Sequence, residues 1–228
     1  YAAKMKWEVG IGTNHVQDAS YPFLIQEKYR AGYFTHYAGE GTIRSAKICY
    51  QGEEVDLCLC RTKAHFSQEG NTRILTLDPV DIEFYDLTLK LQSRLYFEEG
   101  TGTVRIEREI LEMSHPEAQV EINEYMVACY GTTEYPEDMN GIVLRCEGED
   151  PKEIIYAYKC REESLADADA VSAVIPAIET KVSMEASKGG EGYVREGYAF
   201  SPMFTLGYKK KVADKEVFTT WLKLEKAN

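Results

Sequence analysis

A histidine set among aromatic residues is the first place in this sequence where acid–base chemistry could occur. His36 lies in the run Tyr-Phe-Thr-His-Tyr that ends at Tyr37. An imidazole gives or accepts a proton near neutral pH, and it needs a carboxylate within reach to complete a general acid–base pair. Glu40 and Glu134 are candidates for that carboxylate, and we take Glu134. The sequence therefore predicts His36 and Glu134 as catalytic residues, with ordinary solvated loops as the alternative interpretation.

A polar segment near the start of the chain has the composition of a sugar-binding site. Residues 12–18 carry amides, a histidine and a carboxylate, and aromatic residues follow at 33–37. Aromatic rings stack on the apolar faces of pyranoses, while amides and carboxylates bind their hydroxyl groups. Solvated loops have a similar composition and are the simpler interpretation. The residues predicted here to contact a substrate are His15, Asp18, Tyr37 and Tyr135.

Two charged residues occupy positions where the strand pattern requires apolar ones. Arg108 shares the phase of Ile106, and Glu124 shares the phase of Ile122. A charge that faces a sheet interior is costly unless it is paired, so we expect these two side chains to meet. They form either a structural ion pair in the core or part of a wet groove, in which a carboxylate and a guanidinium bind the hydroxyl groups of a substrate.

Motifs for several other chemistries are missing from the sequence. The four histidines show no H-x-H or H-E-x-x-H spacing, and the neighbours Cys58 and Cys60 are too few to form a zinc site. The Gly-x-Gly pieces at residues 10–12 and 39–41 lack the following glycine and helix of a dinucleotide site. The sequence has no phosphate-binding P-loop and no G-x-S-x-G elbow. We therefore expect no metal and no cofactor.

The strands that must position these residues are visible as alternating patterns. In residues 87–97 apolar and polar residues alternate, a Glu-Gly-Thr-Gly turn follows, and residues 104–110 resume the alternation. This pattern predicts an antiparallel hairpin. Residues 120–130 and 218–224 alternate in the same way and predict two further strands.

Shorter apolar segments, separated by turn residues, indicate many more strands. Residues 164–173 are open between a helix capped by Ser164 and an extended segment, which the nearby valines favour. The run Lys209-Lys210-Lys211 is interpreted as a solvated connection. We therefore predict an all-β fold, a large antiparallel two-sheet sandwich with little helix. Residues 1–228 form one domain, or a fragment of a longer chain. The shorter segments are 43–49, 55–60, 73–77, 142–146, 154–158, 181–184 and 201–208.

The charge balance argues against two classes of partner. The chain has 38 acidic and 26 basic residues, and its net charge of -12 repels phosphates and anionic lipids. We therefore expect neither nucleic acid nor membrane as a partner. The sequence shows no run of 18 apolar residues and no signal-peptide pattern at its start. Six scattered cysteines indicate reduced thiols, and together these features predict a soluble, cytoplasmic protein.

The aromatic-rich joints at residues 130–135 and 200–204, within a chain of many strands, resemble those of the β-supersandwich proteins typified by galactose mutarotases. The resemblance implies a fold that also forms non-catalytic amino-terminal domains of several glycoside hydrolases and phosphorylases. In the mutarotases, two histidines and a carboxylate move protons between the sugar ring oxygen and the anomeric hydroxyl. None of the four histidines here matches that pattern residue by residue.

Three functions are therefore expected in order. The first is a carbohydrate-handling domain that binds a mono- or oligosaccharide as part of a larger carbohydrate-active protein. The second is a free-standing aldose mutarotase or epimerase, so the sequence leaves open whether the protein is an enzyme. The third is an assembly protein whose exposed sheet edges and aromatic patches bind other subunits. The protein partner would be a catalytic domain or a second copy of the chain.

Overall fold

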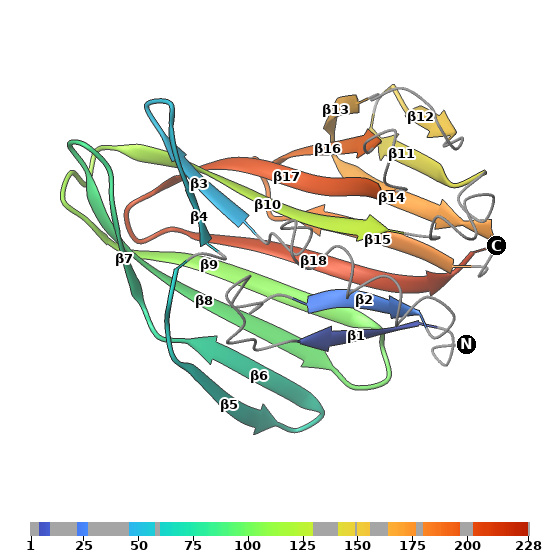
Figure 1. Cartoon of the computed structure of the whole chain (residues 1–228), viewed down its shortest axis with the longest axis horizontal. Coiled ribbons are helices and arrows are strands. Elements are labelled where there is room, and N and C mark those ends of the chain that lie inside the picture. The colour runs from blue at the N-terminus through green and yellow to red at the C-terminus, as the bar shows by residue number, and fades with distance from the viewer. Residues whose placement is uncertain are drawn as a thin grey trace.

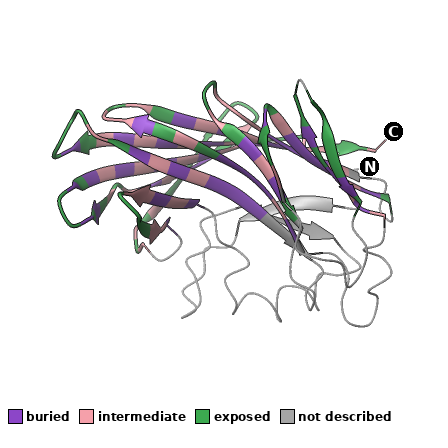
Figure 2. Cartoon of the chain, turned by 90° about the horizontal axis from the view of Figure 1, so that it is seen from above, coloured by how far each residue is buried: buried purple, intermediate pink, exposed green. Residues whose placement is uncertain are grey.

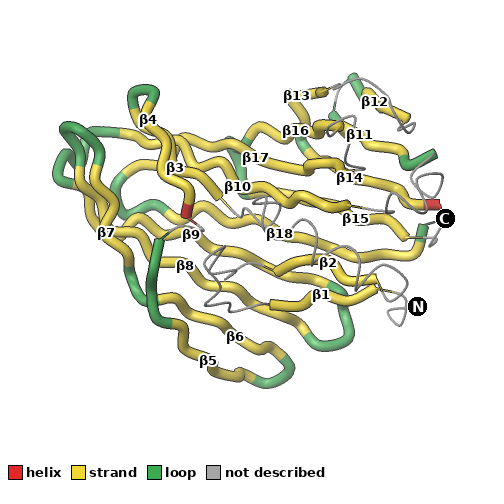
Figure 3. Tube along the Cα trace, in the orientation of Figure 1, coloured by secondary structure: helices red, strands yellow, loops and turns green. Residues whose placement is uncertain are grey.

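The computed structural model is almost entirely β-structure (Figures 1 and 3). Two antiparallel sheets of six and ten strands contain most of the described strands, which confirms the predicted all-β sandwich. No helix among the described residues has the length and apolar character needed to cross a membrane. The described residues are 5–9, 22–26, 46–57, 60–129, 141–148, 150–155, 164–176, 180–196 and 203–227.

The smaller sheet has six strands, each antiparallel to its neighbours. Across the sheet they are β13 (Ser164–Ala168), β16 (Glu191–Glu196), β17 (Met203–Ala213), β10 (Gln119–Cys129), β3 (Ala46–Tyr50) and β4 (Glu53–Asp56). The long strands β10 and β17 form its centre. Their pairing extends over the full length of both strands.

The larger sheet has ten strands, and Figure 1 places β5 and β12 at its opposite rims. A short strand, β7, pairs with β8 beside the main path. Across the sheet the strands are β12 (Lys152–Ile155), β11 (Val143–Glu147), β14 (Ala170–Ile175), β15 (Thr180–Ala186), β18 (Val217–Lys226), β9 (Thr103–Met113), β8 (Thr88–Glu98), β6 (Thr72–Leu77) and β5 (Ala64–Glu69), with β7 at Val80–Glu83.

A separate hairpin precedes both sheets. It consists of β1 (Met5–Val9) and β2 (Pro22–Gln26), which pair antiparallel along their whole length. β2 also lies next to β10 of the six-stranded sheet. The hairpin is therefore close to the face and edge of that sheet.

The hairpin of β8 and β9 shows why the sequence pattern works. Leu91 and Leu95 are buried, while Gln92 and Arg94 between them are half-buried on the other face. Figure 2 shows the same alternation of buried and more exposed residues along many strands. The turn contains Gly102, whose backbone has a φ of +70°. A Cβ there would lie 2.9 Å from the Leu224 carbonyl oxygen, so this turn requires glycine.

Strands β9 and β10 are consecutive in the chain but belong to different sheets. The turn at residues 114–118 carries the chain from one sheet to the other. As a result, the buried Ile106 of β9 and the buried Ile122 of β10 both belong to the core between the sheets. Any two inward-facing side chains on these strands can therefore approach each other across the core.

The prediction that Lys209, Lys210 and Lys211 form a solvated connection is wrong, because they lie within β17. Hydrogen bonds to β10 and β16 on both sides hold this strand through the charged run. Lys210 is on the core-facing phase near the end of the strand, where its Nζ lies 2.9 Å from Glu216. The segment 164–173 is extended, as β13 and β14, rather than helical. Cys60 lies outside β4, contrary to the predicted strand 55–60.

Candidate functional site

Most of the predicted site residues lie outside the described part of the chain. These are the two predicted catalytic residues and four of the residues predicted to contact a substrate, and their roles stay predictions. They are His15, Asp18, His36, Tyr37, Glu134 and Tyr135. The structure describes the other two residues, Arg108 and Glu124.

Arg108 of β9 and Glu124 of β10 form an ion pair between the two sheets. Arg108 Nε donates to Glu124 Oε2 at 2.8 Å, and Arg108 Nη2 donates to Glu124 Oε1 at 3.1 Å. This two-pronged contact is the strongest geometry that a guanidinium and a carboxylate form. Arg108 is 2% exposed and Glu124 is 0% exposed. The alternation of apolar and polar residues therefore correctly predicted that these charges meet, and the pair ties the sheets together inside the core.

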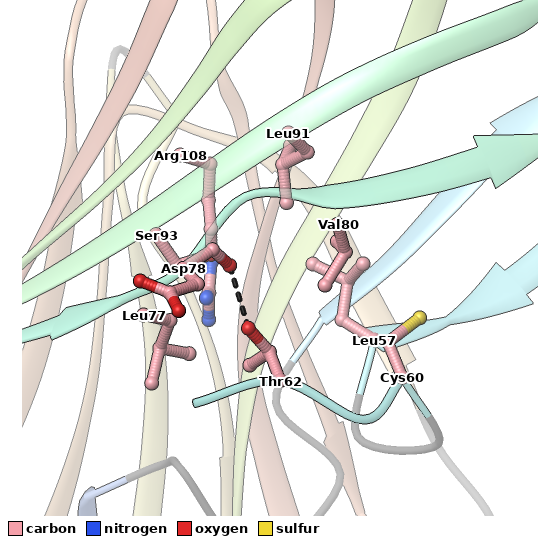
Figure 4. Close-up of a pocket in the computed structure, with 9 residues that line it drawn as sticks. All are labelled: Leu57, Cys60, Thr62, Leu77, Asp78, Val80, Leu91, Ser93 and Arg108. Atoms are coloured by element: carbon pink, nitrogen blue, oxygen red, sulfur yellow. Dashed lines mark hydrogen bonds between the residues drawn. The ribbon is translucent and has the colours of Figure 1, made fainter. Parts of the chain in front are cut away.

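The other side of Arg108 borders a small cavity beneath the segment that joins β4 to β5 (Figure 4). Its volume is about 20 Å³, which accommodates a water molecule but not a sugar ring. Thr62 and Asp78 supply polar atoms to its wall, and the Thr62 hydroxyl donates to the Asp78 carbonyl at 2.7 Å. In this conformation the interior pair has no room for a saccharide beside it. The substrate-binding role of Arg108 and Glu124 stays a prediction, and the Discussion gives its test.

The outer face of the six-stranded sheet carries a second cluster, which combines an aromatic ring with polar groups. The Tyr193 hydroxyl of β16 donates to Asn123 Oδ1 of β10 at 2.9 Å. To do so, the ring crosses β17 at Gly207, where a Cβ would lie 2.3 Å from Tyr193 Cζ. Lys209 Nζ lies 5.7 Å from the centre of the same ring. We call Asn123, Tyr193, Gly207 and Lys209 the tyrosine platform.

Neighbouring residues on the same face extend the tyrosine platform. Gly207 is paired with Tyr193 on one side and with Tyr125 of β10 on the other. Tyr125 is 7% exposed, and Arg195 of β16 is exposed two residues beyond Tyr193. The platform therefore combines aromatic surface, an amide and two cationic side chains on one sheet face. Rings, amides and charged groups of this kind can bind the apolar faces and hydroxyl groups of sugars.

The Tyr193 hydroxyl should show its burial in the pH dependence of stability. Burial raises the pKa of Tyr193 to about 12, whereas a tyrosine in the unfolded chain ionises near pH 10. The folded state then holds a proton that the unfolded state has lost, so the free energy of unfolding falls between about pH 10 and about pH 12.

Replacing Tyr193 with phenylalanine should make this fall less steep. The check is urea unfolding of both proteins at several pH values across the window. Burial also raises the pKa of Tyr208, but Tyr208 is common to both proteins and cancels in the comparison. Equal slopes for the two proteins would show that the Tyr193 hydroxyl is not buried in this way.

A larger hollow lies where β11 and β13 end, and it has a different chemistry. Its volume is about 410 Å³, and its lining includes Glu147, Asp150, Asp167, Asp169 and one lysine, with no aromatic side chain. Within the described ranges, no group of three or more histidines, cysteines or carboxylates could hold a metal ion. An acidic hollow without a ring or a cluster of metal ligands is less suited to sugars than the tyrosine platform is.

The sequence offered partial signals for the tyrosine platform. Asn123 was already on the polar phase of its strand, and Gly207 stands between two apolar residues of another strand. A glycine inside a strand often marks a close approach of another group. The contact of Tyr193 with Asn123 joins residues 70 positions apart, so the local pattern does not reveal it.

No protein-family model matches the sequence, and no curated protein matches it. Solved structures share its fold. The alpha-N-acetylgalactosaminidase NagBb from Bifidobacterium bifidum matches with a TM-score of 0.61 and 7% identity, over 81% of this chain and 31% of its own. The Slr1438 protein from Synechocystis sp. PCC 6803 matches with a TM-score of 0.54 and 12% identity, over 79% of this chain and 73% of its own. At these identities the likeness shows the fold alone, and that fold is galactose mutarotase-like, as the resemblance implied.

Proposed function

We propose that this protein is a carbohydrate-handling β-sandwich that binds a mono- or oligosaccharide on the tyrosine platform. The observation that carries this proposal is the fixed position of the Tyr193 ring, which lies over Gly207 while Asn123 holds its hydroxyl. A ring that is already fixed on a sheet face offers a stacking surface to a pyranose at little further entropic cost.

Polar groups beside the ring suit the hydroxyl groups of a sugar. Lys209 is exposed and can swing its ammonium over a ligand stacked on Tyr193. The Asn123 amide lies at the far end of the ring and supplies donor and acceptor atoms. Together they give the ligand an apolar contact and at least two oriented polar contacts, which is the usual composition of a sugar site.

The fold supports a role as one part of a larger sugar-active protein. NagBb is an alpha-N-acetylgalactosaminidase, and one of its solved structures is a complex with GalNAc. The match to this chain covers only 31% of NagBb. A fold of this kind can therefore occur as a fraction of a sugar-hydrolysing chain. We assign this protein a binding or supporting role beside a catalytic domain.

Replacing Tyr193 with alanine should weaken saccharide binding by at least about tenfold, because the stacking surface is lost. Tyr193→Phe keeps the ring but not its anchor, so a loss of only about twofold to fivefold is expected. The measurement is isothermal titration with a panel that includes galactose, glucose, GalNAc and their oligosaccharides. Tyr85→Ala is the matched control, since Tyr85 is 95% exposed and lies outside the platform.

Two outcomes would count against this function. Binding that is equally weakened by Tyr193→Ala and Tyr85→Ala would place the sugar elsewhere, and no binding of any saccharide would reject a carbohydrate role. Polarimetry on fresh glucose and galactose tests the enzymatic alternative, in which His36 and Glu134 transfer the protons. A mutarotation rate above that of buffer, lost in His36→Ala, would make the protein an enzyme rather than a binding module.

A further inference from the structure

The rim strand β5 of the ten-stranded sheet is open on one side. Its only partner among the described strands is β6, and five of its six residues are exposed. Natural sheets usually protect such an edge with a proline, a lysine or a bulge. β5 reads Ala-His-Phe-Ser-Gln-Glu and contains neither residue, and its register with β6 is regular.

The backbone of β5 presents hydrogen-bonding groups to that open side. The Lys63 carbonyl accepts from the Asp78 N–H at 2.8 Å, so residue 63 points its backbone groups toward β6. In an antiparallel pair these directions alternate along the strand. The N–H and C=O groups of Ala64, Phe66 and Gln68 therefore point away from β6, toward the free edge.

The side chains of β5 add an apolar contact on the core-facing side. Phe66 is in register with Leu75 of β6, which in turn is in register with Leu95 of β8. Leu75 is 1% exposed and Leu95 is 0% exposed, whereas Phe66 is 68% exposed. The apolar row of the core thus continues to the rim, and its last member is uncovered.

We propose that β5 pairs antiparallel with β5 of a second copy of the chain, about a twofold axis at Phe66. This register places Phe66 opposite Phe66 of the partner subunit, on the same face of the joined sheet. It also pairs the outward-pointing groups of Ala64 with those of Gln68 of the partner subunit. The two ten-stranded sheets then become one continuous sheet.

Charge favours this partner and this register. With Phe66 on the axis, Lys63 lies opposite Glu69 of the partner subunit, and the symmetry repeats the contact. Both residues are exposed, and neither forms an ion pair with another described residue. Opposite charges that face each other across two strands stabilise the pairing, while like charges oppose it. A shift of the register by two residues would remove both the aromatic pair and the two charge pairs.

The association should be weak and dependent on concentration. One edge strand of six residues buries less surface than a standard protein–protein interface. We therefore expect a dissociation constant of about 10–100 µM and a rapid exchange of subunits. Because the tyrosine platform is on the other sheet, the dimer does not depend on the proposed function.

Sedimentation velocity over a range of concentrations tests the dimer with the full chain. Phe66→Lys should weaken association by at least about tenfold, because it removes the aromatic pair and places two like charges on the axis. Ile155→Lys is the matched control, since Ile155 is 63% exposed on β12 at the opposite rim of the same sheet. This control should leave the dissociation constant unchanged.

A charge exchange tests the register. Glu69→Lys should weaken association by about tenfold, and Lys63→Glu combined with Glu69→Lys should restore it to within about threefold. A wild-type protein that stays monomeric up to about 1 mM would overturn the proposal. So would a dimer that Ile155→Lys disrupts and Phe66→Lys does not. Failure of the charge exchange to restore association would reject the register.

Discussion

Replacing Glu124 with glutamine is expected to lower the free energy of unfolding by about 3–5 kcal/mol. The substitution keeps the size of the side chain but removes the negative charge that balances Arg108. Because Arg108 is 2% exposed, water cannot solvate its charge in place of the lost partner. The midpoint of thermal unfolding should fall by about 10 °C, at roughly 2–4 °C per kcal/mol for a chain of this size. Urea unfolding followed by circular dichroism gives the value.

A salt bridge one residue away is the matched control for this change. Glu109 follows Arg108 on β9 but faces the outside of the sheet, where its Oε2 lies 2.6 Å from Arg94 Nη1. Both side chains of this pair are about 30% exposed. Glu109→Gln should therefore cost less than about 1 kcal/mol, as exposed ion pairs do. The difference between the two glutamine variants measures the effect of burial.

The double variant separates a structural pair from a binding site. Arg108→Met combined with Glu124→Leu removes both charges, and it should recover most of the stability lost in Glu124→Gln. If the pair is structural, this variant binds saccharides as well as the wild type does. A stable double variant that no longer binds saccharide would instead make Arg108 and Glu124 substrate-binding residues. A loss below about 1 kcal/mol in Glu124→Gln would show that water reaches the pair.

The ion pair shows what local alternation can predict. Each charge breaks the pattern of its own strand, and the strands are consecutive in the chain, so the sequence alone predicts that they meet. The same reasoning failed for Lys209, Lys210 and Lys211, because charge was taken as evidence for a connection. Tyr208 and Val212 on either side are buried, and they continue the strand through the lysines. Apolar phase is therefore a better guide to strand limits than charge.

Contacts between distant strands set the limit of prediction for the rest. The sequence does not say that β10 pairs with β17, which brings Asn123 beside Gly207 and Tyr193. It also gave no signal for β5, since His65 and Phe66 lie in a mostly polar segment that a rim strand can tolerate. The tyrosine platform and the open edge both arise from the order of strands in a sheet, and that order depends on the packing of the whole chain.

Replacing Gly207 with alanine is expected to abolish measurable saccharide binding while the protein remains folded. The new Cβ would lie 2.3 Å from Tyr193 Cζ and 2.5 Å from its hydroxyl oxygen, so the ring must leave the sheet face. The hydrogen bond to Asn123 then breaks, at a cost of about 1–2 kcal/mol in the free energy of unfolding. Gly148→Ala is the control, because its Cβ would meet no atom closer than 3.5 Å.

A double-mutant cycle shows whether the ring is the cause. In a Tyr193→Ala background the ring is absent, so Gly207→Ala should no longer destabilise the protein, and the added Cβ even favours the strand. The coupling between the two positions, measured by urea unfolding, should be about 1–2 kcal/mol. Independent effects of the two substitutions would mean that the ring does not lie over Gly207. Saccharide binding that survives Gly207→Ala would then remove the tyrosine platform from the site.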